Sequence, residues 1–132
     1  YFFKDQIDYN YYFDFSCAYI IEGEDQFDVN KLFGIGYLPG IHSNSARFGW
    51  RWNPSINKLE LFAYVYDKRE RTIEKMAAIN LNTKIGASIR IEKNHYEFIL
   101  TTEGVLINST IIPKTHNWFL GLKLIHTKLP SA

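Results

Sequence analysis

The sequence predicts an all-β protein, a two-sheet antiparallel β-sandwich or jelly roll of about nine strands with little or no helix. The first reason is a two-residue alternation of apolar and polar side chains, which places the two sets on opposite faces of a sheet. Residues 46–52 and 59–66 show it most clearly. The second reason is composition, since aromatic residues make up 17% of the chain and flat rings pack well on pleated strands. The third is that no stretch keeps the apolar spacing of an amphipathic helix.

The N-terminal third predicts two strands separated by polar segments. Residues 8–21 alternate, with aromatic and apolar side chains on one face and mostly polar ones on the other, as in a half-buried strand. An acidic turn follows at 22–26, and the apolar, glycine-interrupted run 31–38 predicts the next strand. Residues 39–44 contain Pro-Gly followed by Ser and Asn, a composition typical of a loop.

The central part predicts two aromatic strands joined by a turn. In 46–52 the even positions are Ala, Phe, Trp and Trp, and the odd positions are Arg, Gly and Arg. The alternation resumes in 59–66 after a short polar turn. The pattern alone does not decide which side of 46–52 faces the core. If the rings face inward, Arg47 and Arg51 face outward with Gly49 between them, which would leave a shallow strip on that face.

The C-terminal half predicts a weaker strand, an antiparallel meander and a closing strand. Residues 72–79 follow a charged turn and form the weaker strand. The runs 85–92, 96–100 and 105–112 are separated by short turns, which is typical of hairpins. Residues 117–126 place apolar side chains on one face and close the chain.

The meander carries a resemblance to a known superfamily. An alternating strand from Ile85 to Glu92 is followed by a short turn, a Tyr-x-Phe strand at Tyr96, a turn at Gly104 and a strand from Val105. This order resembles the back-sheet meander of concanavalin A-like and laminin G-like jelly rolls, over about half the chain. That superfamily includes lectins, glycan-binding modules, glycanases and adhesive or structural domains. The whole chain is also similar to uncharacterised β-sandwich proteins of gut and environmental bacteria, which implies no mechanism.

Length and charge narrow the function classes. We expect a single domain over residues 1–132, with termini that look cut. The net charge is +1 with Lys and Arg spread along the chain, so a nucleic-acid partner is not expected. No apolar run is long enough for a membrane span. The single Cys17 is expected to be a small buried side chain, and it does not fix the compartment. An extracellular or cell-surface location is favoured.

Six residues are the candidates for ligand binding, and they lie on the two central strands and the loop before them: Arg47, Arg51, Tyr64, Tyr66, His42 and Asn44. Guanidinium groups could grip the hydroxyls or carboxylates of a sugar, tyrosine rings could stack on its apolar face, and the loop side chains could add hydrogen bonds. The alternative is that the rings belong to the core and the arginine stems merely cover the sheet.

Metal and cofactor sites are not expected. An acidic cluster offers oxygen ligands of the kind that Ca²⁺ takes: Glu22, Glu24, Asp25, Asp28 and nearby Asn30. Its spacing matches no EF-hand loop, so a solvated acidic turn is the favoured interpretation and Ca²⁺ is only weakly supported. The four histidines show no zinc-motif spacing: His42, His95, His116 and His126.

Catalysis is disfavoured. Glycanases of the resembled fold carry a Glu-x-Asp-x-x-Glu triplet on one strand, and no predicted strand here offers it, nor is there a Gly-x-Ser-x-Gly elbow. Lyase chemistry through Tyr, His and Arg stays open. We therefore predict a non-catalytic, lectin-like carbohydrate-binding domain. The alternative is a structural or assembly domain, of a surface, a filament or a virion, whose aromatic strands contact other protein subunits in an oligomer.

Overall fold

The computed structural model describes residues 6–13, 30–37, 45–67, 70–114 and 121–125, and at 31, 35–37 and 121–125 it describes the backbone alone. These residues form nine strands and no helix. The strands are β1 (Gln6–Phe13), β2 (Asn30–Tyr37), β3 (Ser45–Asn53), β4 (Lys58–Asp67), β5 (Glu70–Ile79), β6 (Thr83–Ile91), β7 (His95–Thr102), β8 (Val105–Pro113) and β9 (Gly121–Ile125).

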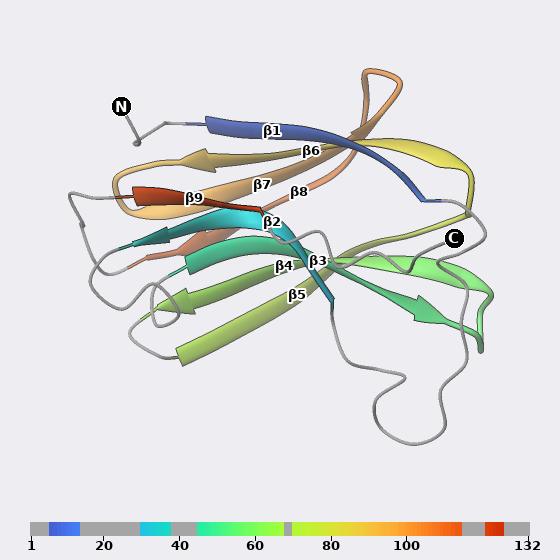
Figure 1. Ribbon diagram of the computed structural model, residues 1–132, viewed down its shortest axis with the longest axis horizontal. Coiled ribbons are helices and arrows are strands. Elements are labelled where there is room, and N and C mark those ends of the chain that lie inside the picture. Colours follow the sequence, from blue (N-terminus) through green and yellow to red (C-terminus); the bar gives the residue numbers. More distant parts are fainter. Residues whose placement is uncertain (1–5, 14–29, 38–44, 68–69, 115–120, 126–132) are drawn as a thin grey trace.

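The strands form two antiparallel sheets that lie as two layers (Figure 1). The first sheet has the order β1-β6-β7-β8, and the second has the order β5-β4-β3-β2-β9. The predicted all-β, two-sheet antiparallel sandwich is therefore confirmed. The predicted meander is confirmed as well, because β6, β7 and β8 pair in succession.

The core lies between the layers and is rich in aromatic rings. Phe48 of β3 is fully buried, with its ring centroid 5.4 Å from that of Phe33 in its own sheet and 5.2 Å from that of Phe98 in the other. Tyr9 of β1 likewise reaches Phe33, at 4.6 Å between centroids. These contacts settle the orientation of β3: its even positions face the core, and its odd positions lie on the outer face of the second sheet.

Tight turns set the register of the local hairpins. Glu103 and Gly104 both have positive φ, 50° and 80°, and they link the paired residues Thr102 and Val105. Two consecutive positive φ values are the mark of a type I′ turn, whose twist matches that of the strands it joins. Asn57 in the β3–β4 turn also has positive φ, 55°, which asparagine tolerates better than most residues.

Side-chain hydrogen bonds join the two sheets along one side, where the edge strands β5 and β8 meet. Asn108 Nδ2 donates to the carbonyl oxygen of Met76 at 2.7 Å. Thr110 Oγ1 donates to Glu74 Oε2, also at 2.7 Å. We call these two contacts the β5–β8 seam. They replace, with side chains, part of the backbone pairing that each edge strand lacks there.

Several predicted boundaries change or cannot be compared. β5 begins at Glu70, inside the predicted charged turn, because Glu70 and Arg71 pair with the end of β4. The predicted strand 8–21 is described only to Phe13, and the predicted strand 117–126 corresponds to β9. Cys17, the acidic turn at 22–26 and the loop at 39–44 lie outside the described residues.

Two general features of the described residues bear on function. None of their elements is a helix with the length and apolar character needed to cross a bilayer. They also contain no group of three or more His, Cys, Asp or Glu side chains placed to hold a metal ion. Most of the predicted acidic cluster lies outside the described ranges, so the calcium interpretation stays untested.

Candidate functional site

Four of the six predicted ligand-binding residues lie on the outer face of the second sheet. Arg47 pairs with Tyr64 across β3 and β4, and Ser45 pairs with Tyr66, while Arg51 lies two odd positions further along β3. The structure thus brings the two arginines and two tyrosines onto one face, which the binding hypothesis required. The loop candidates His42 and Asn44 lie outside the described residues.

This face is not the exposed strip that the sequence led us to expect. Gly49 is buried, and Phe62 and Tyr64 are each only 5% exposed. Arg47 is 8% exposed. A two-residue pattern shows that two faces differ in polarity, but it does not show that the more polar face is open to water. The Phe62 and Tyr64 rings therefore offer no open surface for stacking a sugar, and the Tyr66 ring is half-buried.

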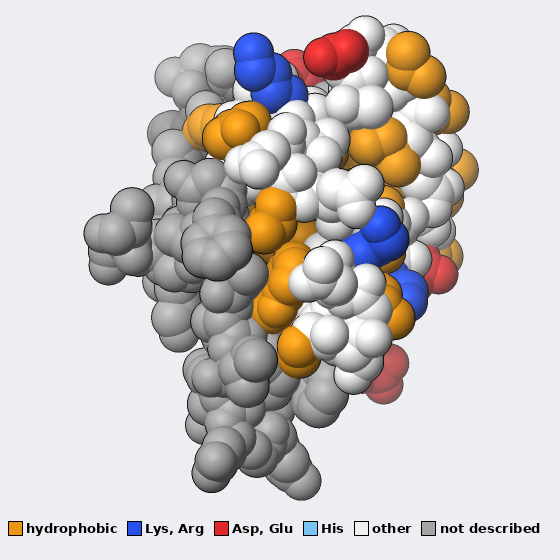
Figure 2. Space-filling view, turned by 90° about the vertical axis from the view of Figure 1, so that its right-hand side faces the viewer, with side chains coloured by type: hydrophobic (Ala, Val, Ile, Leu, Met, Phe, Trp, Pro, Cys, Tyr) orange, Lys and Arg blue, Asp and Glu red, His pale blue; other side chains and the backbone are white. Residues whose placement is uncertain are grey.

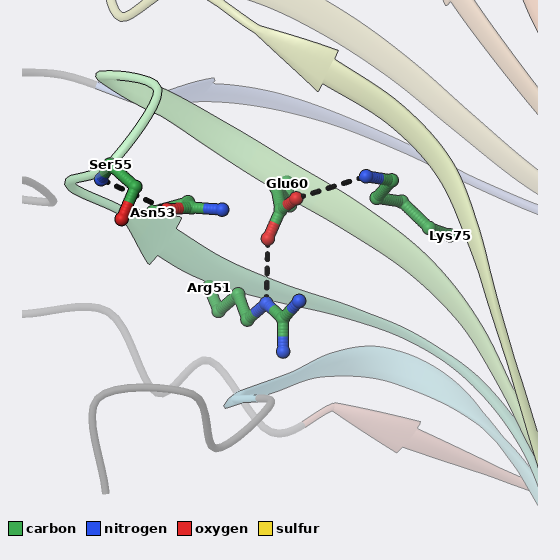
Figure 3. A network of polar contacts seen from close by, with 5 residues as sticks. All are labelled: Arg51, Asn53, Ser55, Glu60 and Lys75. Carbon is green, nitrogen blue, oxygen red and sulfur yellow. Dashed lines mark hydrogen bonds and ion pairs between the residues drawn. The ribbon is translucent and has the colours of Figure 1, made fainter. Parts of the chain in front are cut away.

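Arg51 belongs to an ion network instead of an open binding surface (Figure 3). Its Nε donates to Glu60 Oε1 at 2.6 Å, and Lys75 Nζ donates to Glu60 Oε2 at 3.2 Å. The Arg51 guanidinium also lies 4.9 Å from the centroid of the Phe62 ring, a cation–π distance. Burial acts to raise the pKa of Glu60, but the hydrogen bonds from Arg51 and Lys75 outweigh it and hold that pKa below its usual value.

A second group of polar side chains lies at the other end of the same face, and we call it the Arg47–Arg71 cluster: Arg47, Tyr64, Tyr66 and Arg71. The Tyr64 hydroxyl donates to the Tyr66 hydroxyl at 3.3 Å, and the ring centroids are 5.5 Å apart. Arg71 pairs with Tyr66 in the sheet, and its pKa is raised, first by a hydrogen bond with Tyr64. Burial lowers the pKa of Arg47. Sequence reasoning missed Arg71, because it was assigned to a turn.

The outer face of the first sheet carries an open hollow of about 420 Å³, which we call the Gly86 hollow. The side chains around it come from three strands and one turn: Asn10 and Tyr12 of β1, Lys84 of β6, Thr101 of β7 and Glu103. Gly86 forms its floor. A Cβ there would lie 2.5 Å from Thr101 Oγ1 and 3.6 Å from Asn10 Oδ1, so these two oxygen atoms flank the space that the glycine leaves.

Tyr12 gives the hollow an aromatic wall. It is 53% exposed, the condition in which a tyrosine ring is available for stacking. Its hydroxyl donates to Asn82 Oδ1 at 3.1 Å, which fixes the outer end of the side chain. The predicted alternation of 8–21 already placed Asn10 and Tyr12 on the polar face. What it did not show is that β1 pairs with β6, where Asn10 meets Gly86 and Tyr12 meets Lys84.

Among the residues that the structure describes, the end of the molecule at the right of Figure 1 carries no large patch of one charge. Figure 2 shows this end, and among its coloured residues the basic and acidic side chains are few and lie among apolar and uncharged surface. Broad basic surfaces are the electrostatic footprint of nucleic-acid binding. The described part of this end therefore gives no support for a nucleic-acid partner.

Comparison with known proteins places this chain in no family: no family model matches it, and neither does a curated protein or a solved structure. The resemblance to concanavalin A-like and laminin G-like jelly rolls accordingly stays an expectation about ancestry, whereas the two-sheet antiparallel architecture stands on the described strands themselves.

Proposed function

We propose that this domain binds carbohydrate without catalysing a reaction, and that the Gly86 hollow is its binding site. The observation that carries the proposal is the exposed Tyr12 ring beside a glycine-floored depression flanked by an amide and a hydroxyl side chain. An apolar body with a few convergent polar groups is the usual make-up of a small-molecule site. A pyranose ring has the matching form, with one face of C–H groups and a rim of hydroxyls.

Each wall of the hollow has a role in this proposal. The Tyr12 ring packs against the C–H face of the sugar. Asn10 offers both a donor and an acceptor, and Thr101 a hydroxyl that serves as either, so both suit the mixed character of sugar hydroxyls. Gly86 has no side chain of its own, which leaves room for the Thr101 hydroxyl to lie over the β6 backbone, 2.5 Å from where a Cβ would be.

The charge of the lining favours a neutral sugar. The lining residues with charged side chains are Lys84 and Glu103, one of each sign. A ligand with a carboxylate or sulfate group would be attracted by Lys84 and repelled by Glu103, so its charge would bring little net affinity. Lys84 can still donate a charged hydrogen bond to a sugar hydroxyl, and Glu103 can accept one. The shallow, open form of the hollow is suited to the end or the side of a polysaccharide.

The test compares two variants of one residue. Tyr12→Ala removes the ring, and Tyr12→Phe keeps the ring while removing the hydroxyl that bonds Asn82. The wild-type chain is first screened against an array of neutral and acidic glycans, and the strongest ligand is titrated calorimetrically. We expect Tyr12→Ala to abolish measurable binding and Tyr12→Phe to retain it within about threefold.

A matched control lies at the β3–β4 turn. Ile56 is an apolar residue that is 48% exposed, so Ile56→Ala removes exposed surface away from the hollow and should leave binding unchanged. If no glycan on the array binds, or if Tyr12→Ala binds as well as the wild type, the hollow is not a carbohydrate site.

A second candidate function is assembly with other copies of the chain, and the apolar surface of β8 favours it. Val105, Leu106 and Ile111 are 65%, 60% and 57% exposed, on a strand at the edge of the first sheet. Light scattering behind size-exclusion chromatography tests it. An oligomer that Leu106→Lys dissociates would support assembly through β8, and a monomer at high concentration would remove this candidate.

A further inference from the structure

We propose that the Arg47–Arg71 cluster is a separate binding site for a small oxyanion of the phosphate or sulfate type. The site lies on the second sheet, whereas the Gly86 hollow lies on the first, so the two proposals rest on different residues.

Arg47 is a buried cation whose bonding is incomplete. It is 8% exposed, and its Nε is buried without a hydrogen-bond partner among the described residues. Its stem lies against Gly34 of β2, where an added Cβ would be only 2.7 Å from Arg47 Cγ. Packing thus holds the side chain in place. A buried charged donor that lacks a partner is costly, so its presence calls for a compensating anion or water.

Two tyrosine hydroxyls and a second arginine lie near Arg47 on this face. Tyr64 pairs with Arg47 across β3 and β4, and Tyr66 pairs with Ser45. Arg71 lies opposite Tyr66, is exposed to solvent, and also interacts with both hydroxyls. The cluster therefore extends from a buried guanidinium to an exposed one, with phenol groups between them. Guanidinium forks are the groups that recognise phosphate and sulfate oxygens, and this cluster supplies two of them.

The rest of this face does not neutralise the cluster. Its other described charges are Lys58, whose Nζ donates to Asn80 Oδ1, and the ion network, in which Glu60 is shared by Arg51 and Lys75. That network already has one cation more than it has carboxylates. Its carboxylate is held by short bonds within the network and is not free to pair with Arg47. The described part of the face is thus net positive around a donor that lacks a partner.

The experiment titrates the full chain with inorganic phosphate and with sodium sulfate, against sodium chloride at equal ionic strength. The readout is the Nε–Hε cross-peak of Arg47 in a ¹H–¹⁵N NMR spectrum, assigned by its loss in Arg47→Lys. We expect a saturable shift with phosphate or sulfate and none with chloride. In Arg71→Gln, which alters an exposed side chain, we expect binding about tenfold weaker or absent.

The matched control is Arg90→Gln, which removes an exposed arginine from the first sheet. It should leave the phosphate titration unchanged, as should Tyr12→Ala, so failure of the glycan proposal and of this one are distinguishable. An Arg47 cross-peak that does not respond to phosphate or sulfate would overturn the proposal, because it would mean that the charge is already satisfied. Equal weakening by Arg90→Gln and Arg71→Gln would overturn it too, since it would indicate unspecific attraction.

Discussion

Arg51 and Glu60 face one another across the β3–β4 pair, with Arg51 Nε 2.6 Å from Glu60 Oε1. The Glu60 side chain is 1% exposed and takes its second cation, Lys75, from β5 at 3.2 Å. One buried carboxylate thus links three neighbouring strands. Both cations keep contact with water, since the side chains of Arg51 and Lys75 are 24% and 54% exposed. The buried carboxylate is therefore the group whose charge is stabilised mainly by the network.

The lowered pKa of Glu60 predicts a loss of stability in acid. Because folding holds this pKa below its ordinary value of 4.5, the contribution is fully present above that pH. It is lost as the pH falls through the lowered pKa. At neutral pH, Glu60→Gln should lower the free energy of unfolding by about 2 kcal/mol, less than for a fully buried pair because both cations can turn to solvent. Urea unfolding at a series of pH values measures both effects.

The comparison variant is Glu97→Gln, which removes the carboxylate of the exposed pair Arg90–Glu97, 3.1 Å apart on the first sheet. Exposed pairs contribute little, so its cost should be within about 0.5 kcal/mol. If the stabilities of Glu60→Gln and the wild type fall in parallel below pH 4.5, the Glu60 carboxylate is not the group that titrates, and the prediction is wrong.

The Arg51–Glu60 pair also shows how far the sequence could be interpreted. The register of a hairpin depends on neighbouring residues and a short turn. The sequence pattern was therefore sufficient to predict that Arg51 and Glu60 lie opposite one another. The fold class, the β6–β8 meander and the shared face of Arg47 and Tyr64 were predicted for the same local reason.

The pairing of β1 with β6 was not within reach. It joins residues that are about 80 positions apart, as with Asp8 and Ser88. The sequence of neither segment indicates which strand it pairs with. The Gly86 hollow depends on that pairing, so the sequence pattern could not point to it. Burial of the outer face around Arg47 is likewise a property of the whole fold.

Filling the Gly86 hollow should remove carbohydrate binding while preserving the fold. Gly86→Thr suits a strand, and the nearest atom to its Cβ would be the hydroxyl of Thr101, a side-chain end that can rotate away. We expect the free energy of unfolding to stay within about 1 kcal/mol of the wild-type value, and we expect no glycan binding detectable by calorimetry. Ser88→Thr adds a methyl group at the next outward position of β6, outside the hollow lining, and should bind normally. Normal binding by Gly86→Thr would exclude the hollow.

Tyr11 predicts a loss of stability in alkali. Burial, and then the neighbouring Tyr9, raise its pKa from 10 to about 12. The folded state therefore keeps the phenolic proton while the unfolded chain loses it, so stability is full below pH 10 and falls as the pH rises toward 12. Its hydroxyl is buried and has no hydrogen-bond partner among the described residues. Tyr11→Phe should be as stable as the wild type at pH 7 or about 1 kcal/mol more stable.

Chemical unfolding between pH 7 and pH 12 checks this for the wild type and Tyr11→Phe. The variant should match or slightly exceed the wild type at neutral pH, and the difference should grow in its favour above pH 10. A variant that is clearly less stable at pH 7 would show that the hydroxyl is bonded, which would contradict the prediction.

Gly34 should tolerate no side chain. A Cβ there would lie 2.0 Å from the carbonyl oxygen of Ala46 and 2.7 Å from Arg47 Cα, and these backbone atoms cannot move without parting β2 from β3. Gly34→Ala is expected to cost about 2–4 kcal/mol in urea unfolding. Gly104→Asn is the control: nothing lies within 4 Å of a Cβ there, and asparagine tolerates its positive φ of 80°. It should cost less than about 1 kcal/mol.

The β5–β8 seam should open when its side-chain bond to Met76 is lost. Asn108→Ala leaves that carbonyl without its donor, at a cost of about 1 kcal/mol, while Thr110 and Glu74 hold the other end of the seam. Amide hydrogen exchange should therefore speed up in β5 and β8 and stay unchanged in β1, on the far side of the first sheet. Ser109→Ala is the control, since it alters the neighbouring side chain and keeps the backbone bond to Asn108. Edge strands freed in this way pair readily with other chains, so the variant should also aggregate sooner on heating. Uniformly faster exchange in all strands would instead mean that the seam has no local role and that Asn108 acts only through global stability.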